Sequence, residues 1–317
     1  MLIKEFLSEH NIHYEENVSL AQKSWIRFGG TAGFWVTPDS VEQLTDICRF
    51  LNENNVEFDL VGQTSNIFFH STYNPQVIVS TVKVNNYEIN GETITCDCGV
   101  SVVKLSKDCL SKGYAGFYGL VGLPGTVGSA IYNNASCFQC SLSSMLISAD
   151  VLRLDGTIQT IDKEEFNFTH RSSAFKRKVQ KGIVLRVKLK AVFASNLDNE
   201  LIMSRKTVIY RREKQEQSRR ILGSVFANKR MRKNLRNFII KAAMKTLPKV
   251  TCLSQQYIQK RLTLFLYGYQ GLNDFVSDRQ INTFIWRDNR AELQFARYKK
   301  MMNKVYKDLV IEIEERR

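Results

Sequence analysis

A glycine-rich loop near the middle of the chain has the composition of a phosphate-binding loop. Residues 121–135 read VGLPGTVGSAIYNNA, with Gly122, Gly125 and Gly128 at every third position and Pro124 before the second glycine. Glycine accepts positive φ and has no Cβ, so such a loop can point several backbone N–H groups into one concavity that suits a pyrophosphate. The loop is neither a Rossmann GxGxxG nor a Walker loop. A tight structural turn is the alternative.

Cysteine and histidine content argues against a metal site. The chain has seven cysteines and four histidines, and Cys137 and Cys140 form a CxxC directly after the glycine loop. A zinc site needs a second pair at comparable spacing together with histidines, and a redox CxxC needs a thioredoxin-like βαβ context. Neither is found, so the sequence predicts free thiols and no metal.

Positive charge is concentrated in one segment. The formal net charge is +14, and residues 201–261 alone carry +15, from seventeen Lys and Arg against Glu213 and Glu216. This density points to a phosphorylated or acidic partner. Because no recognisable nucleic-acid-binding module accompanies the charge, a nucleotide diphosphate, an acidic surface and a merely solvated helical face are the alternatives.

No targeting segment or membrane span is predicted. Residues 1–17 are amphipathic and acidic, and no run of about 18 apolar residues occurs. The length of 317 residues favours two or three domains, and a cytoplasmic globular protein is expected.

Hydrophobic periodicity and turn residues predict the elements that must position these groups. Residues 1–74 are expected to form an α/β unit in which Ser40 caps a helix. Its predicted elements are a helix over 1–16, two strands about a glycine turn within 24–37, a helix over 41–51, and strands at 58–62 and 67–69. Residues 75–195 are expected to form a β-rich α+β unit with hairpin turns at Asn90-Gly91 and Asp155-Gly156. Its predicted elements are strands within 77–103, a helix over 102–112, a hairpin over 147–162 and a strand at 183–194.

The remaining part of the chain, residues 196–317, is expected to form a third, α+β unit. Its predicted elements are helices over 199–218 and within 229–262, strands at 262–269 and within 275–286, a helix over 289–308 opened by Asp288, and a closing strand at 309–314.

Five spaced segments together resemble one family. They are 26–32 (IRFGGTA), 61–66 (VGQTSN), 122–128 (GLPGTVG), 171–175 (RSSAF) and 223–228 (GSVFAN). In this order and spacing the chain resembles the MurB-type UDP-N-acetylenolpyruvoylglucosamine reductases, which are flavoenzymes of peptidoglycan precursor synthesis. The resemblance is strong over 17–228, thin over 229–270, and recovers in 275–289 and at the C-terminal end.

The resemblance implies an α+β fold of the MurB and vanillyl-alcohol-oxidase (PCMH) type. Residues 1–74 and 75–195 would then be two FAD-binding subdomains, and residues 196–317 a substrate domain whose last strand, 309–314, returns to the active site. The glycine loop would donate backbone N–H groups to the FAD pyrophosphate. The residues implied to bind FAD are Arg27, Gly29, Gly30, Gly62, Gln63, Thr64, Ser65, Asn66, Gly122, Pro124, Gly125, Thr126, Gly128, Ser129 and Asn134.

The resemblance also implies roles in catalysis. NADPH would reduce the flavin, and the flavin would pass the hydride to the CH2 carbon of an enolpyruvyl ether. Arg171 would bind the substrate carboxylate, Ser224 would donate the proton to carbon, and Glu314 would be the catalytic glutamate. Strand alternation alone does not distinguish Glu314 from Glu312. The residues implied to hold the sugar nucleotide and its carboxylate are Lys214, Asn228, Gln280 and Arg316.

Several departures from the family pattern leave other functions open. Thr64, Ser129, His170 and Ala227 replace the usual residues, and the segment 236–244 lacks the usual glycines. The main interpretation is an NADPH-driven, FAD-dependent reductase of UDP-N-acetylglucosamine enolpyruvate, acting as a cytoplasmic monomer without nucleic acid. One alternative is a divergent flavoprotein that acts on another sugar nucleotide in surface-polysaccharide synthesis. The second is a non-catalytic basic binding protein that uses 201–261 to hold RNA or anionic lipid.

Overall fold

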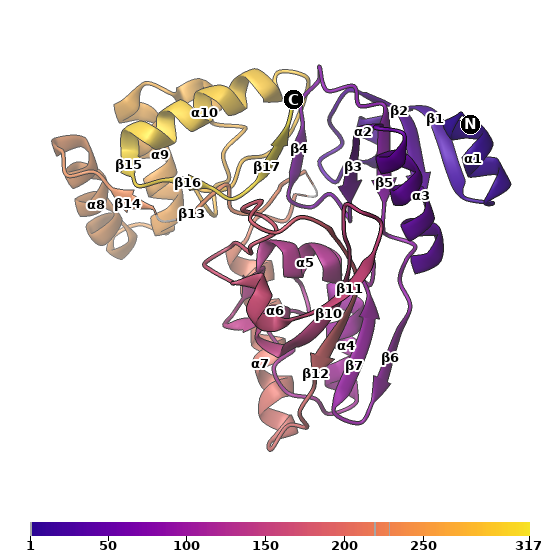
Figure 1. Ribbon diagram of the computed structural model, residues 1–317. Coiled ribbons are helices and arrows are strands. Elements are labelled where there is room, and N and C mark those ends of the chain that lie inside the picture. Colours follow the sequence, from indigo (N-terminus) through magenta and orange to yellow (C-terminus); the bar gives the residue numbers. More distant parts are fainter. Residues whose placement is uncertain (1, 219, 228) are drawn as a thin grey trace. The chain divides into compact units, whose positions relative to one another are not determined.

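The computed structural model describes residues 2–218, 220–227 and 229–317, and these fall into two compact units (Figure 1). Unit 1 comprises the chain up to Val18 together with Thr31–Thr64 and Asn74–Ile209. Unit 2 comprises Ser19–Gly30, Ser65–Tyr73 and Tyr210–Arg317. The chain therefore passes from unit 1 to unit 2 directly after Thr64, inside one of the predicted cofactor segments.

The first sheet of unit 1 leads into the predicted cofactor segment that begins at Gly62. Its strand order is β1-β2-β5-β3, and β5 pairs in parallel with both β2 and β3. The strands are β1 (His13–Ser19), β2 (Thr31–Thr37), β3 (Phe58–Val61) and β5 (Val77–Ser80). Helix α3 (Val41–Glu53) connects β2 to β3 and begins at Ser40, whose hydroxyl accepts from the Gln43 N–H at 3.2 Å. Its buried face shares a core with the strands and with α1 (Ile3–Glu9).

The second sheet of unit 1 has strand order β11-β10-β12-β7-β6, and every neighbouring pair is antiparallel. The strands are β6 (Tyr87–Asn90), β7 (Thr93–Asp97), β10 (Leu146–Leu152), β11 (Ile158–Asp162) and β12 (Ile183–Lys190). Helices α4 (Val102–Ser111) and α5 (Val127–Asn133) bury apolar side chains in the same core as the strands. The glycine loop lies between these two helices, so it leads directly into α5.

Unit 2 is built from helices and short strand pairs around an aromatic core. Helix α7 (Leu197–Lys214) enters it, and α8 (Leu235–Thr246), α9 (Gln255–Tyr267) and α10 (Ala291–Val305) follow. Three strand pairs close the unit: β4 (Ile67–Phe69) with β17 (Glu314–Arg316), β13 (Phe226–Ala227) with β16 (Val310–Ile311), and β14 (Arg230–Met231) with β15 (Tyr306–Lys307). Phe68, Phe284, Trp286, Phe295 and Tyr298 are each at most 2% exposed in its core. The core therefore fixes β4 against elements from the far end of the chain.

The remaining elements are short. They are α2 (Leu20–Lys23), β8 (Ser136–Cys137), β9 (Cys140–Ser141), α6 (Leu142–Met145), and the 3-10 turns η1 (Lys163–Phe166), η2 (Leu247–Lys249) and η3 (Gln270–Leu272). The seven cysteines are free, as predicted. Within the described part of the chain, no group of three or more His, Cys, Asp or Glu is placed to hold a metal ion.

Three predicted elements in the first 80 residues are wrong. The N-terminal helix ends at Glu9, because Asn11 adopts a positive φ of 52° and the chain continues as β1. Within 24–37 only β2 is a strand. The strand at 77–80 belongs to the first sheet rather than with the strands that follow it, because it pairs with β2 and β3.

Two predicted strands in the last 60 residues are also wrong, and a third is divided into two. The apolar run from Leu262 continues α9, whose buried Ile258 and Leu264 keep helical spacing. Within 275–286 the structure has an isolated bridge from Val276 to Phe284 in place of a strand. The closing segment forms two short strands, β16 and β17, which are separated at residues 312 and 313.

Candidate active site

The two predicted cofactor loops of unit 1 contact each other. Gln63 follows β3, and its Oε1 accepts from the Gly125 N–H at 2.9 Å. A Cβ on Gly62 would lie 2.5 Å from Thr126 Oγ1, so only glycine permits this approach. Thr64 is 4% exposed and adopts a positive φ of 54°, a conformation that costs a non-glycine residue on the order of 1–3 kcal/mol. The packing of the two loops therefore holds a strained turn in place.

The glycine loop uses its N–H groups differently from the prediction. Of the three glycines, Gly125 alone has positive φ, 129°. Its N–H donates to Gln63, and the Gly128 N–H donates to the Cys98 carbonyl at 2.8 Å. The expectation that these N–H groups point together into a concavity is wrong for both residues. A Cβ on Gly128 would lie 2.8 Å from Cys98 Cβ, so this glycine serves close packing of α5.

The polar groups of these loops nevertheless fit a diphosphate cofactor by their chemistry. Thr126 and Ser129 form a capping box at the start of α5, in which Ser129 Oγ accepts from the Thr126 N–H at 3.0 Å. The segments 62–64 and 122–129 contain amide and hydroxyl groups and no carboxylate, so they would not repel the negative charge of FAD. Gly122 and Pro124 lie in the same loop.

The segments that contain Asn134 and Arg171, also in unit 1, are hydrogen-bonded to each other. Asn134 ends α5 at a positive φ of 46°, and its Nδ2 donates to the Thr169 carbonyl at 2.7 Å. Arg171 has a positive φ of 58°, and its Nη1 donates to the Ser136 carbonyl at 2.8 Å. Reciprocal hydrogen bonds thus join the segments 134–136 and 169–171. They hold the half-buried Arg171 side chain on a strained turn, as is common at functional sites.

Three predicted site segments converge in unit 2. The Glu314 N–H donates to the Asn66 carbonyl at 2.9 Å, and Asn66 Nδ2 donates to the Glu312 carbonyl at 3.1 Å. The Glu312 N–H donates to the Val225 carbonyl at 2.9 Å. Since Val225 follows Ser224 directly, the predicted cofactor turn, proton donor and catalytic glutamate lie on neighbouring, hydrogen-bonded segments.

The segment after Ser224 is fixed by a residue that the sequence analysis did not identify. Asn282 is 3% exposed; its Oδ1 accepts from the Phe226 N–H at 3.1 Å, and its Nδ2 donates to the Phe226 carbonyl at 2.8 Å. Its main-chain carbonyl accepts from the Val225 N–H at 2.9 Å. Ser224 itself is exposed and follows Gly223, which has a φ of 72°. The exposed hydroxyl therefore lies on a rigid segment. In the sequence, the only indication of a role for Asn282 was its position two residues after Gln280.

Glu314 and Arg316 are ion-paired in β17, with 3.0 Å between Oε2 and Nη2. Because residues 312 and 313 interrupt the strand, the expected shared face of Glu312 and Glu314 does not follow from regular alternation. The structure therefore places the two predicted side chains, Glu314 and Arg316, together.

The turn at 27–30 belongs to unit 2. Arg27 has a positive φ of 59° and donates from Nη1 to the Gln22 carbonyl at 3.2 Å. A Cβ on Gly29 would lie 2.7 Å from Leu20 Cβ, and the Gly30 carbonyl accepts from the Leu20 N–H at 2.9 Å. Arg27, Gly29, Gly30, Ser65 and Asn66 are thus in unit 2, whereas the other predicted FAD ligands are in unit 1.

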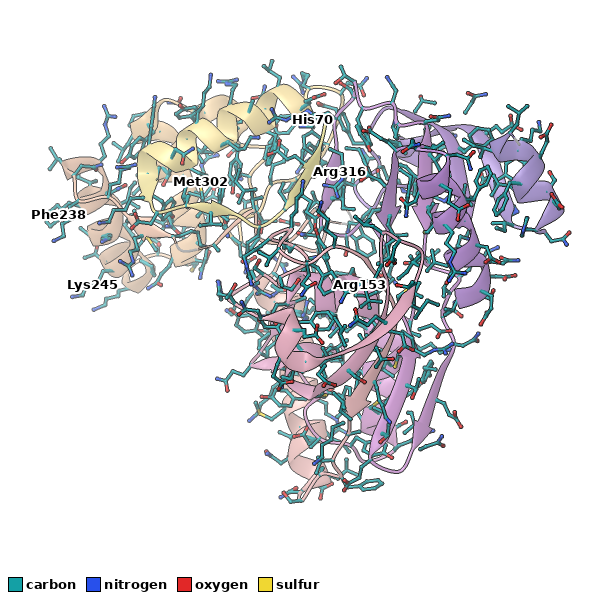
Figure 2. The ribbon with its side chains drawn as sticks, viewed as in Figure 1. His70, Arg153, Phe238, Lys245, Met302 and Arg316 are labelled. Atoms are coloured by element: carbon teal, nitrogen blue, oxygen red, sulfur yellow. The ribbon has the colours of Figure 1, made fainter. Side chains whose placement is uncertain are left out.

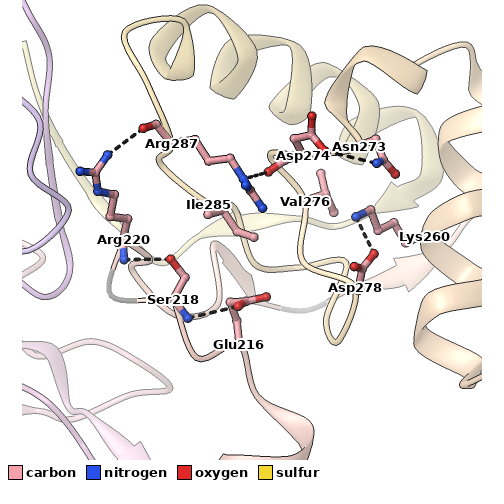
Figure 3. A pocket seen from close by; sticks show the side chains of 10 residues that line it. All are labelled: Glu216, Ser218, Arg220, Lys260, Asn273, Asp274, Val276, Asp278, Ile285 and Arg287. Atoms are coloured by element: carbon pink, nitrogen blue, oxygen red, sulfur yellow. Dashed lines mark hydrogen bonds and ion pairs between the residues drawn. The ribbon is translucent and has the colours of Figure 1, made fainter.

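A polar cavity of about 480 Å³ lies in unit 2, and Glu216 and Asp278 in its lining are two positions from the predicted residues Lys214 and Gln280 in sequence (Figure 3). Its lining residues are Glu216, Ser218, Arg220, Lys260, Asn273, Asp274, Val276, Asp278, Ile285 and Arg287. Arg279 Nη1 donates to the Gln215 carbonyl at 2.8 Å, and Ser277 Oγ donates to Glu216 Oε2 at 2.7 Å. These bonds fasten the segment after Lys214 to the segment before Gln280. Asn228, also predicted to bind substrate, lies outside the described residues.

Two guanidinium groups in this cavity are bonded to main-chain carbonyls. Arg220 Nη1 donates to the Arg287 carbonyl at 2.7 Å, and Arg287 Nε donates to the Asp274 carbonyl at 2.6 Å (Figure 3). Lys260, whose side chain is 3% exposed, pairs with Asp278 at 2.7 Å. The lining therefore contains three cations, Arg220, Lys260 and Arg287, and three carboxylates, Glu216, Asp274 and Asp278, so its formal charge is balanced.

A charged network that the sequence analysis missed holds β17 in place. The ring nitrogens of His70 lie 2.6 Å from Glu292 Oε1 and 3.1 Å from Glu315 Oε2, and Glu315 also pairs with Lys299 at 2.6 Å and Arg317 at 3.0 Å. His70 and Arg316 are labelled in Figure 2. Burial opposes ionisation of Glu315, but hydrogen bonds from Lys299, Arg317 and His70 outweigh it and lower its pKa to about 2. The only sequence signal was a histidine directly after an apolar strand.

The chain is similar to known flavoproteins in sequence. Residues 32–162 match a family model described as an FAD binding domain. The UDP-N-acetylenolpyruvoylglucosamine reductase of Bacillus licheniformis is 31% identical over 214 residues, covering 67% of this chain and 70% of that protein. The protein of the same name from Halalkalibacterium halodurans is 32% identical over 216 residues, again covering 67% and 70%.

A solved structure agrees with these relatives. The crystal structure of UDP-N-acetylenolpyruvylglucosamine reductase (MurB) from Thermus caldophilus matches with a TM-score of 0.68 and 20% identity, covering 96% of this chain and 99% of that one. The predicted α+β FAD-binding fold is confirmed.

Proposed function

Since the chain belongs to the UDP-N-acetylenolpyruvoylglucosamine reductase family, we propose that it reduces the enolpyruvyl group of UDP-N-acetylglucosamine enolpyruvate to give UDP-N-acetylmuramate. It is an FAD oxidoreductase, and we propose NADPH as the hydride donor and the cytoplasm as its location. When bound, FAD would supply the hydride chemistry. The protein's own residues must then bind the carboxylate, stabilise the charge that develops on it, and deliver a proton to carbon.

The convergence of the Asn66, Ser224 and Glu314 segments in unit 2 supports this proposal most directly. Asn66 and Glu314, almost 250 positions apart in sequence, are joined there by a main-chain hydrogen bond of 2.9 Å. We assign the Ser224 hydroxyl as the proton donor, because it is exposed on a segment that Asn282 and β16 hold rigid. Glu314 and its partner Arg316 would then form the charged group beside it.

Arg171 is proposed to bind the substrate carboxylate. Its guanidinium presents a planar fork, and the hydrogen bond from Nη1 to the Ser136 carbonyl limits how the fork can turn. An arginine aimed at a carboxylate stabilises the negative charge that hydride addition builds there.

Lys214, Gln280 and the adjoining cavity are proposed to hold the sugar nucleotide, together with Asn228. Lys214 ends α7 and is exposed, so its ammonium group is available to a diphosphate. The residues proposed to contact FAD are Gln63, Thr64, Thr126, Ser129, Asn134, Arg27, Ser65 and Asn66.

A Ser224→Ala variant tests the proposal by separating the two half-reactions. Flavin reduction by NADPH should keep its wild-type rate, whereas reoxidation by UDP-N-acetylglucosamine enolpyruvate should slow by at least about 100-fold, since general acid catalysis typically contributes that much. Ser111→Ala, which removes an exposed hydroxyl from α4, is the matched control. Equal loss in both half-reactions would contradict the role given to Ser224.

A further inference from the structure

Helix α8 presents large apolar side chains to solvent. Leu235 is 74% exposed, Phe238 69% and Ile239 41%. Helical spacing of three and four residues places these side chains and Ala242 on one outward face, which we call the α8 patch. The opposite face of the helix packs inward through Asn237 and Ile240. A surface helix normally reserves its outward face for polar residues, so the α8 patch requires an explanation.

Cations border this apolar face. Lys241 and Lys245 are one turn apart along one edge of α8, and Arg236 lies on the other edge, over the Tyr267 ring at 5.3 Å. Figure 2 shows the labelled Phe238 and Lys245 projecting from α8 into solvent. Neither Lys241 nor Lys245 pairs with a carboxylate of the described chain, and no Asp or Glu occurs anywhere between Glu216 and Asp274.

The turn after α8 continues the same composition. Val250 is 79% exposed, Leu253 is 45% exposed, and Lys249 lies between them and the helix. Apolar side chains alternating with lysines, without acidic residues, are typical of helices that lie in the plane of a membrane interface.

We propose that the α8 patch seats unit 2 on an anionic lipid bilayer. Leu235, Phe238 and Ile239 would enter the boundary between headgroups and acyl chains, while Lys241 and Lys245 contact lipid phosphates. Over the described residues, no helix is long and apolar enough to cross a bilayer, and the patch needs only a helix that lies flat.

Other partners match these observations less well. A nucleic acid would engage the lysines and stack bases on Phe238, but it would leave Leu235 and Ile239 in water. A second copy of the chain would bring two equally basic segments together.

Fluorescence of a Phe238→Trp variant of the full chain tests the proposal. Vesicles of phosphatidylcholine mixed with phosphatidylglycerol should shift its emission to shorter wavelength relative to the wild-type protein. Vesicles of pure phosphatidylcholine should produce a much smaller shift, because the cations then have no lipid charge to bind.

Cosedimentation with the same mixed vesicles supplies the magnitudes. Phe238→Ser should weaken binding roughly tenfold, from the lost apolar burial. The double variant Lys241→Glu/Lys245→Glu should weaken it by at least about 30-fold, at about one kilocalorie per mole for each lysine. Lys107→Glu/Lys181→Glu changes the net charge equally at exposed positions of unit 1 and should bind within about twofold of wild type.

Several outcomes would overturn the proposal. They are no emission shift with anionic vesicles, equal weakening by the control pair and the Lys241/Lys245 pair, or a shift that polyuridylate RNA or self-association produces and vesicles do not. Because the altered side chains are exposed, thermal unfolding should be unchanged in every variant.

Discussion

Glu315 connects the end of the chain to the body of unit 2, and replacing it with glutamine isolates the contribution of its charge. The carboxylate pairs with Lys299 and Arg317 and lies 3.1 Å from a ring nitrogen of His70. The same strand carries Glu314 and Arg316, so the substitution perturbs the support of the proposed site without touching its reacting groups. Glutamine keeps the size and one acceptor oxygen of the side chain.

The pKa of Glu315 sets the expected magnitude. Hydrogen bonds from Lys299, Arg317 and His70 overcome the effect of burial and lower this pKa from 4.5 to about 2 in the folded protein. A carboxyl group with a lowered pKa in the folded state stabilises the protein above its unfolded pKa, and this stabilisation is lost as the pH falls toward the folded value. The difference corresponds to about 3 kcal/mol of unfolding free energy near pH 7 and to about 1 kcal/mol near pH 3.

Urea unfolding followed by tryptophan fluorescence measures this effect, since Trp286 is buried in the core of unit 2. The destabilisation caused by Glu315→Gln should shrink by about 2 kcal/mol between pH 7 and pH 3. Glu57→Gln, at an exposed position of unit 1, corrects for the general effect of acid and should change stability little at either pH. A destabilisation by Glu315→Gln that is independent of pH would refute the reasoning.

Three further changes test the proposed site. Arg171→Lys should lower turnover strongly with little change in stability, because lysine cannot present a planar fork; near-normal turnover would refute the assignment. Gly62→Ala should lower stability by about 1–3 kcal/mol and reduce flavin content, because the new Cβ would lie 2.5 Å from Thr126 Oγ1; wild-type absorbance at the flavin bands would contradict this. Asn282→Ala should lower the free energy of unfolding by about 2–4 kcal/mol, because it leaves the main-chain N–H and carbonyl of buried Phe226 without these partners. It should also slow flavin reoxidation by substrate more than flavin reduction. An unchanged free energy of unfolding would show that the Ser224 segment does not depend on Asn282.

Local patterns predicted the elements whose signals are self-contained. The helix after Ser40 has its cap and its apolar period in one stretch, and the hairpins over Asn90-Gly91 and Asp155-Gly156 have their turns. The strand at 77–80 was assigned to the wrong sheet. Its partners β2 and β3 lie earlier in the chain, and an apolar sequence alone does not indicate which strands it pairs with. The apolar run at 262–267 had the composition of a strand and became helix because its buried positions continue the period of α9.

The sequence identified the segments that form the candidate site, but not the hydrogen bonds that join them. Family-like motifs identified Asn66, Ser224 and Glu314, but the hydrogen bonds that join them through Glu312 and Val225 connect residues too distant for any local pattern. Asn282 and His70 were missed for the same reason, since each acts through partners elsewhere in unit 2. Composition predicted that the glycine loop directs its N–H groups into a concavity. The structure differs at Gly125, because its N–H donates to the Gln63 side chain.

The central claim is that this chain carries a flavin that delivers hydride to an enolpyruvyl sugar nucleotide. Its most direct test is the anaerobic absorbance spectrum of the purified, FAD-reconstituted protein during sequential addition of NADPH and UDP-N-acetylglucosamine enolpyruvate. We predict that NADPH bleaches the flavin bands and that the sugar nucleotide restores them. A protein that retains no FAD, or a reduced flavin that the sugar nucleotide leaves unchanged, would contradict the account.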